Sequence, residues 1–272
     1  MDQVDMHIHT TASDGTMSPR DVTSLAAMQG LKAIALTDRD TMSGIPEAGE
    51  AGALLGVTII PGIEISSDYK GRAVEILGYF LDSEDRKLLD YEAWVLERRR
   101  ERLMKMAEKL RHKGFDVSTE AEHPGVPDRS DLAGQLVELG VADSVREAFR
   151  RYLGEGRSCY VPRERIPFAD AAKLIRDCGG AAVLAHPLRY GFPGSELDAL
   201  VKTAAAEKFS GMEILYPGYT RSDQDKLYSL AEKYMLLPTG GSGFRGGDRQ
   251  DRLGEPQVPA YMLIMLAQSQ FR

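Results

Sequence analysis

The chain has 272 residues, of which 43% are hydrophobic and 28% charged, and a chain of this size buries a sizeable core without disulfides. Its formal net charge of −7 argues against a general nucleic-acid-coating protein or a protein held on an anionic membrane surface. The two cysteines, Cys159 and Cys178, form no disulfide framework, and the N-terminus lacks the basic start and apolar stretch of a signal peptide, so we expect a soluble, cytoplasmic protein with reduced thiols.

Short apolar strands alternate with helices over the first third of the chain. Ser18-Pro19 is a typical helix start, an N-cap followed by proline, and Gly30 and Gly56 follow the two expected helices as stops. The apolar pattern predicts helices over about 19–29 and 45–55, and strands over 4–9, 33–36, 57–65 (broken at its proline) and 73–81. This alternation is typical of a parallel sheet with both faces covered.

The pattern changes at about residue 87. From there to about residue 156 we find helical patterns and no convincing strand, with two shorter helices at 131–139 and 144–153. The alternation then resumes, with helices over 168–178, 196–206 and 222–234 and strands over 181–185, 212–215 and 236–239. We therefore expect an α/β barrel or wound sheet built from residues 1–86 and 157–272, with residues 87–156 inserted as a lid-like helical subdomain.

Two histidines, His7 and His9, lie at the end of the first expected strand. Residues two apart on a strand point to the same face, so both imidazoles can approach one ion. Asp14 follows in a loop of small residues. The alternative is an exposed strand end with two incidental histidines, but active sites of α/β proteins lie at the carboxyl ends of strands.

Polar residues follow three further strands. Glu64 closes the third strand, His186 follows the strand over 181–185, and Asp38 and Asp40 follow the second. Taken singly, each has a simpler explanation: a surface carboxylate, a histidine before proline, or a cap for the next helix. Because all of them lie at the same rim, we interpret the three histidines and Glu64 as a binuclear metal site in which the glutamate is the bridge.

Five segments resemble the successive motifs of the PHP family of metal-dependent phosphoesterases: DMHIHTTASDGTMSP, AIALTDRDTMSGIPEA, IPGIEIS, VEILGYF and GGAAVLAHP. The stretch from DRSDLAGQLVELG to EAFRRYLGEGRSCYVPR resembles the helical insertion of the nucleotide-phosphatase branch. The resemblance covers nearly the whole chain. It implies a distorted (β/α)₇ barrel that holds up to three divalent ions and hydrolyses phosphate from nucleoside monophosphates, 3′,5′-bisphosphonucleotides or oligonucleotide ends.

The chain departs from the family pattern at five polar positions. Histidines of the family pattern are replaced at Arg39, Glu75, Asp131 and Arg245, and an aspartate is replaced at Gly243. Arginine is permanently protonated and has no lone pair with which to ligate a cation. The resemblance therefore leaves three unequal metal pockets. The first keeps His7, His9 and Glu64, the second keeps Glu64 and His186 with Glu75 as an oxygen donor, and the third keeps Asp14 alone.

The expected site combines metal ligands with a phosphate clamp. We expect Arg39, Arg245 and Asp14 to be the catalytic groups, with the two arginines held by Asp14 or Asp131 and binding a substrate phosphate. Arg129 and Asp131 are the further substrate contacts that we expect from the insertion. The metal ligands implied by the resemblance are His7, His9, Glu64, Glu75 and His186. They suit one or two divalent ions (Mn, Fe or Zn) rather than three.

Our preferred hypothesis is a metal-dependent phosphoesterase with a reduced metal site, acting on a small phosphorylated, nucleotide-like substrate. The alternative is a catalytically impaired PHP-fold protein that binds or senses a phosphorylated ligand or anion. A purely structural subunit ranks last, because the histidine pair and Glu64 are retained. No apolar run approaches the ~20 residues of a membrane span, and we expect neither a membrane partner nor a stable nucleic-acid partner.

The carboxylate missing at Gly243 leaves one question open. Asp38, Asp40, Asp248 and Asp251 are the acidic residues that could take its place. Restoring an aspartate at position 243 is expected to return a carboxylate to the first metal pocket.

Overall fold

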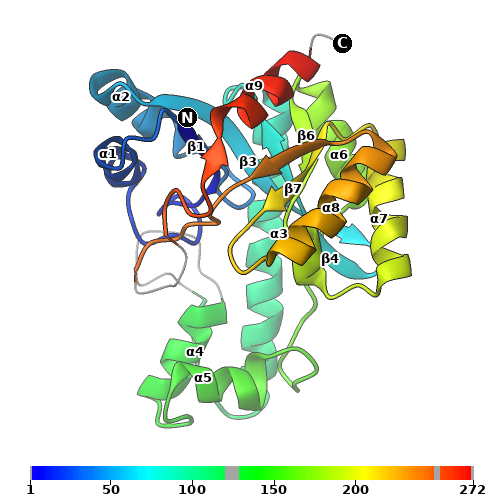
Figure 1. Ribbon diagram of the computed structural model, residues 1–272. Coiled ribbons are helices and arrows are strands. Elements are labelled where there is room, and N and C mark those ends of the chain that lie inside the picture. The colour runs from blue at the N-terminus through cyan, green and yellow to red at the C-terminus, as the bar shows by residue number, and fades with distance from the viewer. Residues whose placement is uncertain (1, 120–128, 248–251, 271–272) are drawn as a thin grey trace. The chain divides into compact units, whose positions relative to one another are not determined.

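The computed structural model describes residues 2–119, 129–247 and 252–270, which fold into two compact units (Figure 1). One unit comprises Met1–Leu89 with Arg165–Arg272, and the other Asp90–Glu164. Helix α3 (Arg86–Arg111) begins in the first unit and continues in the second. The helical unit extends beyond residue 156 because Cys159 is buried in its core.

A nine-stranded sheet forms the first unit, in the order β8-β7-β6-β4-β3-β2-β1-β9, with the short β5 paired to β3. The strands are β1 (Gln3–Ile8), β2 (Ala33–Leu36), β3 (Thr58–Tyr69), β4 (Arg72–Tyr79), β5 (Ile166–Pro167), β6 (Ala181–Leu184), β7 (Gly211–Leu215), β8 (Leu237–Gly240) and β9 (Val258–Pro259). The segment after β8 returns to β1, where His9 N donates to Phe244 O over 2.8 Å. The sheet is therefore a nearly closed barrel, as expected from the sequence.

The buried carboxylate of Asp5 holds this closure together. It accepts hydrogen bonds from Ser242 N at 2.9 Å and from Gly254 N at 2.8 Å, so β1 is tied to two segments near the C-terminus. Gly241, directly after β8, lies against the backbone of β1, because a Cβ placed there would be 2.5 Å from His7 N. Glycine is required at this position because no side chain fits between the two backbones.

The helices of the barrel unit begin and end at ordinary sequence signals. They are α1 (Pro19–Met28), α2 (Ile45–Leu55), α6 (Phe168–Asp177), the 3₁₀ helix η2 (Pro187–Tyr190), α7 (Gly194–Ala206), α8 (Arg221–Tyr234) and α9 (Ala260–Ser269). Ser18 caps α1 by accepting from Asp21 N, and Gly56 ends α2 with a φ of 72°. Thr220 and Asp223 form a capping box at the start of α8.

The expectation of an all-parallel sheet is wrong at β4. Strands β3 and β4 form an antiparallel hairpin from Gly62↔Tyr79 to Tyr69↔Arg72, and β4 is also antiparallel to β6. The two-residue turn is Lys70-Gly71, with φ of 54° and 80°, as a type I′ turn requires. Strand β3 also continues through its proline without a break.

An apolar core fills the barrel and ends below the polar rim. Its members include Met6, Leu77 and Val183 from the strands, with Met262 and Leu266 from α9 packed against them. Helix α9 begins where Ala260 N donates to Asp2 O, at the amino end of β1. The core therefore closes the amino ends of the strands and leaves the carboxyl ends free for polar chemistry.

The helical unit has its own core. Helices α4 (Arg129–Glu138), α5 (Val145–Ala148) and the π-helix η1 (Phe149–Leu153) pack with the second part of α3. Leu103, Leu110, Leu132 and Leu136 are buried there. Among the described residues of the whole chain, no helix is both long and apolar enough to cross a membrane.

Candidate metal centre and anion pocket

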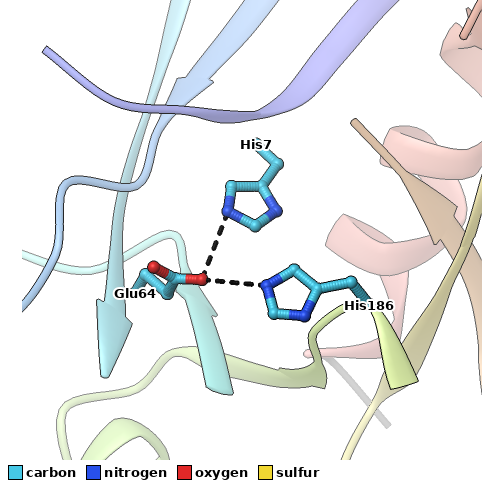
Figure 2. Close-up of side chains that lie close together, drawn as sticks. All are labelled: His7, Glu64 and His186. Atoms are coloured by element: carbon cyan, nitrogen blue, oxygen red, sulfur yellow. Dashed lines mark hydrogen bonds and ion pairs between the residues drawn. The ribbon is translucent and has the colours of Figure 1, made fainter. Parts of the chain in front are cut away.

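Three side chains from three strands meet at the carboxyl end of the barrel (Figure 2). His7 belongs to β1, Glu64 to β3, and His186 follows β6. His7 Nε2 lies 3.4 Å and His186 Nε2 3.3 Å from Glu64 Oε1. All three side chains are buried, and their donor atoms lie within 4.8 Å of one another. Within the described chain, this trio is a grouping of side chains that could hold one metal ion.

The trio fits a divalent metal ion by its donor chemistry. Two imidazoles and a carboxylate are ligands that zinc and other first-row metals accept. The nitrogens of His7 and His186 that face Glu64 Oε1, at 3.4 Å and 3.3 Å, belong to buried side chains. A cation bound between them would meet two imidazoles and an anionic oxygen, so the residues present fit a divalent ion.

Glu213 orients two of these histidines, and sequence reasoning missed it. It lies in β7, fully buried, with Oε1 3.1 Å from His7 Nδ1, and its Oε2 accepts from His186 N over 2.7 Å. Burial alone lowers the pKa of His7, but the Glu213 and Glu64 carboxylates outweigh it and raise that pKa to about 9. A carboxylate on Nδ1 leaves Nε2 facing the site, as in carboxylate–histidine–metal groups.

Arg39 and Arg245 converge on Asp14 from the ends of β2 and β8. The Nε atoms of the two arginines lie 3.5 Å and 3.2 Å from Asp14 Oδ2. Burial opposes ionisation of Asp14, but His9 and the two arginines outweigh it and lower its pKa to about 2. Arg39 also lies 3.6 Å from Glu75 Oε1 on β4. The structure brings together Asp14, Arg39 and Arg245, as the family resemblance implied, and their catalytic role stays a prediction.

His9 lies beside the trio, with Nε2 3.7 Å from Glu64 Oε2, but an arginine contacts it more closely. Its Nε2 is 2.8 Å from Arg245 Nη2 and 3.1 Å from His7 Nε2, and its Nδ1 is 3.3 Å from Asp14 Oδ1. Burial, followed by the charges of His7 and Arg245, outweighs the carboxylates and holds the pKa of His9 well below its usual value. In this structure His9 is a neutral acceptor for an arginine.

Neither described aspartate of the second motif replaces the carboxylate missing at Gly243. Asp38 accepts from Thr10 N at 2.7 Å and from Ser13 Oγ at 2.5 Å, so it holds the loop that carries Asp14. Asp40 Oδ1 accepts from Ser66 N at 2.9 Å. Asp248 and Asp251 lie outside the described residues.

A cavity of about 370 Å³ opens beside the trio. Its lining contains three arginines, Arg39, Arg189 and Arg245. The other lining residues are Glu75, His186, Tyr190 and Tyr216. Arg189, from η2, donates to Tyr216 Oη over 3.2 Å. Sequence reasoning did not single it out, although it lies three residues after the histidine of the AHP motif. Three guanidiniums against one carboxylate give this cavity an excess of positive charge, which suits an anion.

The two substrate contacts expected in the insertion belong to the helical unit. Arg129 and Asp131 lie in the first turn of α4. The Arg129 guanidinium carbon is 5.4 Å from the centroid of the Phe149 ring, within the same unit. Their contact with a substrate stays a prediction.

Tyr216 fills the volume that a side chain at position 243 would need. A Cβ at Gly243 would overlap Tyr216 Oη and lie 3.0 Å from Tyr216 Cζ, and the backbone there has a φ of 60°. An aspartate at this position requires Tyr216 to move, so its expected return of a carboxylate to the first pocket depends on that movement.

We expect Gly243→Ala to destabilise the protein by about 1–2 kcal/mol from the left-handed backbone, and further through the overlap with Tyr216. The overlap should be relieved in a chain that also carries Tyr216→Leu, so the double variant is less destabilised than the sum of the singles. Urea unfolding of the four proteins measures this coupling. Strict additivity would show that Tyr216 does not set the residue at position 243.

Comparison with known proteins agrees with this geometry. Residues 5–152 match the model of the PHP domain. The chain is 34% identical over 243 residues to a 5′-3′ exoribonuclease of Haemophilus influenzae, covering 88% of this chain and 89% of that protein. It is 30% identical over 249 residues to a 3′,5′-nucleoside bisphosphate phosphatase of Chromobacterium violaceum, covering 90% and 87%.

A solved structure resembles the whole chain. The crystal structure of a candidate metal-dependent phosphoesterase from Bifidobacterium adolescentis matches with a TM-score of 0.80 and 26% identity, over 98% of this chain and 96% of that one. The matches confirm the resemblance drawn from the sequence motifs. The chain belongs to the PHP domain family.

Proposed function

We propose that this chain is a metal-dependent phosphoesterase that removes phosphate from a small, nucleotide-like substrate. The main support is that a buried trio of potential metal ligands lies next to a cavity lined by three arginines. His186 belongs to both the trio and the cavity lining. Both features favour hydrolysis of a phosphate ester, because metal cations and guanidiniums neutralise the charge that develops on the phosphoryl oxygens. The curated relatives also act on phosphate esters of nucleotides or RNA.

The arginines take the role of positioning the phosphoryl group. Arg39 and Arg245 are held by Asp14, so their guanidiniums are oriented before substrate arrives. Arg189 approaches the same cavity from η2 and is braced by Tyr216. A bound divalent ion supplies positive charge for the phosphoryl oxygens and lowers the pKa of attacking water. Mn, Fe or Zn suit this donor set.

Phosphate release from defined substrates tests the proposal. We expect the chain, loaded with Mn²⁺, Fe²⁺ or Zn²⁺, to release phosphate from a nucleoside monophosphate, a 3′,5′-bisphosphonucleotide or a 5′-phosphorylated RNA oligonucleotide, and to lose this activity with a chelator. Arg245→Ala should lower kcat/KM by about 100-fold, because a charged donor to the phosphate is lost.

The matched control is Arg20→Ala. The Arg20 side chain is 50% exposed and pairs with Glu50 on the surface, so this change should leave kcat/KM unaltered. A metal-loaded chain that binds these phosphates but releases none would contradict the proposal and favour the alternative, an anion-binding PHP-fold protein.

A further inference from the structure

The spacing of the trio suits one ion. Ligand atoms about 2.0–2.2 Å from a tetrahedral ion lie about 3.3–3.6 Å from one another. The separations of Glu64 Oε1 from His7 Nε2 and His186 Nε2, 3.4 Å and 3.3 Å, fall in this range. Both nitrogens face the same oxygen, Glu64 Oε1 (Figure 2), and Glu213 holds the His7 ring by its Nδ1 and the His186 segment by its backbone N.

His9, the neighbouring histidine, already contacts a cationic side chain, that of Arg245. Arg245 Nη2 lies 2.8 Å from His9 Nε2, and a guanidinium has donors only, so this nitrogen uses its lone pair to accept. Arg245 is held in place by Asp14 at 3.2 Å and by the carbonyl oxygen of Gly243 at 2.7 Å. A second ion on His9 would have to displace this arginine and would then lie beside a permanent positive charge.

The second carboxylate oxygen of Glu64, Oε2, also contacts an arginine. Arg39 Nη1 lies 2.9 Å from Glu64 Oε2, an ion contact, while Oε1 faces the two trio histidines. In the two-oxygen bridging mode each carboxylate oxygen ligates one ion, and Arg39 occupies the oxygen that the second ion would need. The backbone fixes Arg39 here, because Asp40 N donates to Glu64 O and Glu64 N to Asp38 O, so this segment runs beside β3.

We infer that the chain binds a single divalent ion, between His7, Glu64 and His186, and that Arg39 and Arg245 supply the positive charge of the further ions. The inference deepens the proposed function and rests on it. The cavity then has the single ion beside it and three guanidiniums in its lining, and only the ion depends on bound metal. His9 is then a positioning residue for Arg245 rather than a metal ligand.

Metal stoichiometry tests the inference independently of activity. The full chain, stripped with chelator, reloaded with Mn²⁺ or Zn²⁺ and desalted, should retain one ion per chain by elemental analysis, with one Mn²⁺ environment by electron paramagnetic resonance. His186→Ala should weaken binding by about 100-fold or more, whereas His9→Ala should change the dissociation constant less than about threefold. Circular dichroism of each variant shows whether it is folded.

Removal of both arginines tests the inference in the opposite direction, because it should create further metal sites. Arg39→His with Arg245→His removes both guanidiniums and should raise the stoichiometry above one, whereas the surface control Arg20→His should stay at one. Two ions in the unmodified chain, or loss of the ion in folded His9→Ala, would overturn the inference and leave the proposed phosphoesterase function intact. No retained ion together with no phosphate release would overturn both.

Discussion

A chain carrying Glu64→Gln is expected to bind divalent metal at least about 100-fold more weakly and to lose about 3 kcal/mol of stability in the metal-free state. The Glu64 carboxylate is fully buried and faces His7 and His186 on one oxygen and Arg39 on the other. An amide carries no charge, so Arg39 loses its strongest buried partner and the metal trio loses its anion. Urea unfolding and metal titration measure the two effects.

Glu75→Gln is the matched control. Glu75 pairs with the same arginine at 3.6 Å, but its side chain is 19% exposed and lies outside the metal trio. Its loss should cost less than about 1 kcal/mol and leave metal affinity nearly unchanged. If Glu75→Gln weakened metal binding as much as Glu64→Gln, Glu75 would be a ligand, as the sequence motif suggested.

Gly241→Ala is expected to destabilise the barrel by about 3 kcal/mol or more. The added methyl would lie 2.5 Å from His7 N, and neither backbone can rotate away as a side chain would. The barrel has to open between β8 and β1, which also displaces His7 from the metal trio. Urea unfolding measures the first effect and metal titration the second.

Gly49→Ala provides the comparison in the same unit. Gly49 lies within α2, and a Cβ there would meet nothing within 4 Å. Alanine should therefore leave stability unchanged or raise it by up to about 1 kcal/mol, through better helix propensity. A Gly241→Ala protein as stable as Gly49→Ala would mean that β1 and β8 do not close as described.

Local signals were sufficient for most elements of the barrel. Strand Ala33–Leu36 and helix Ile45–Leu55 have the bounds that the apolar pattern and Gly56 predicted. The β3–β4 hairpin was missed because its turn, Lys70-Gly71, lacks the strong asparagine–glycine signal. Strand β9 was missed because two residues are too few to show alternation.

One part of the site that could be predicted consists of residues whose side chains have a single, fixed charge. The pairing of Arg39 and Arg245 with Asp14 followed from their opposite charges and from the family resemblance, which placed all three in one pocket. Glu213 was missed although it carries a visible signal, a charged residue between apolar neighbours in a predicted strand.

Two features of the site have no local signal in the sequence. The choice of His9 as the acceptor for Arg245, and the overlap of Tyr216 with position 243, depend on side-chain volumes that only the closed barrel brings together.

The tie between Asp5 and Gly254, 249 residues apart, has a consequence for synthesis of the protein. The ribosome releases the N-terminal strand first, yet that strand pairs with β9 and is anchored by residues after β8. Contacts of such long sequence separation form late, because a long loop has to close before they contribute. His7 and His9 therefore leave the ribosome early and remain without Glu213 and Arg245 until the later strands have been made. The metal trio is complete only after His186 has been made.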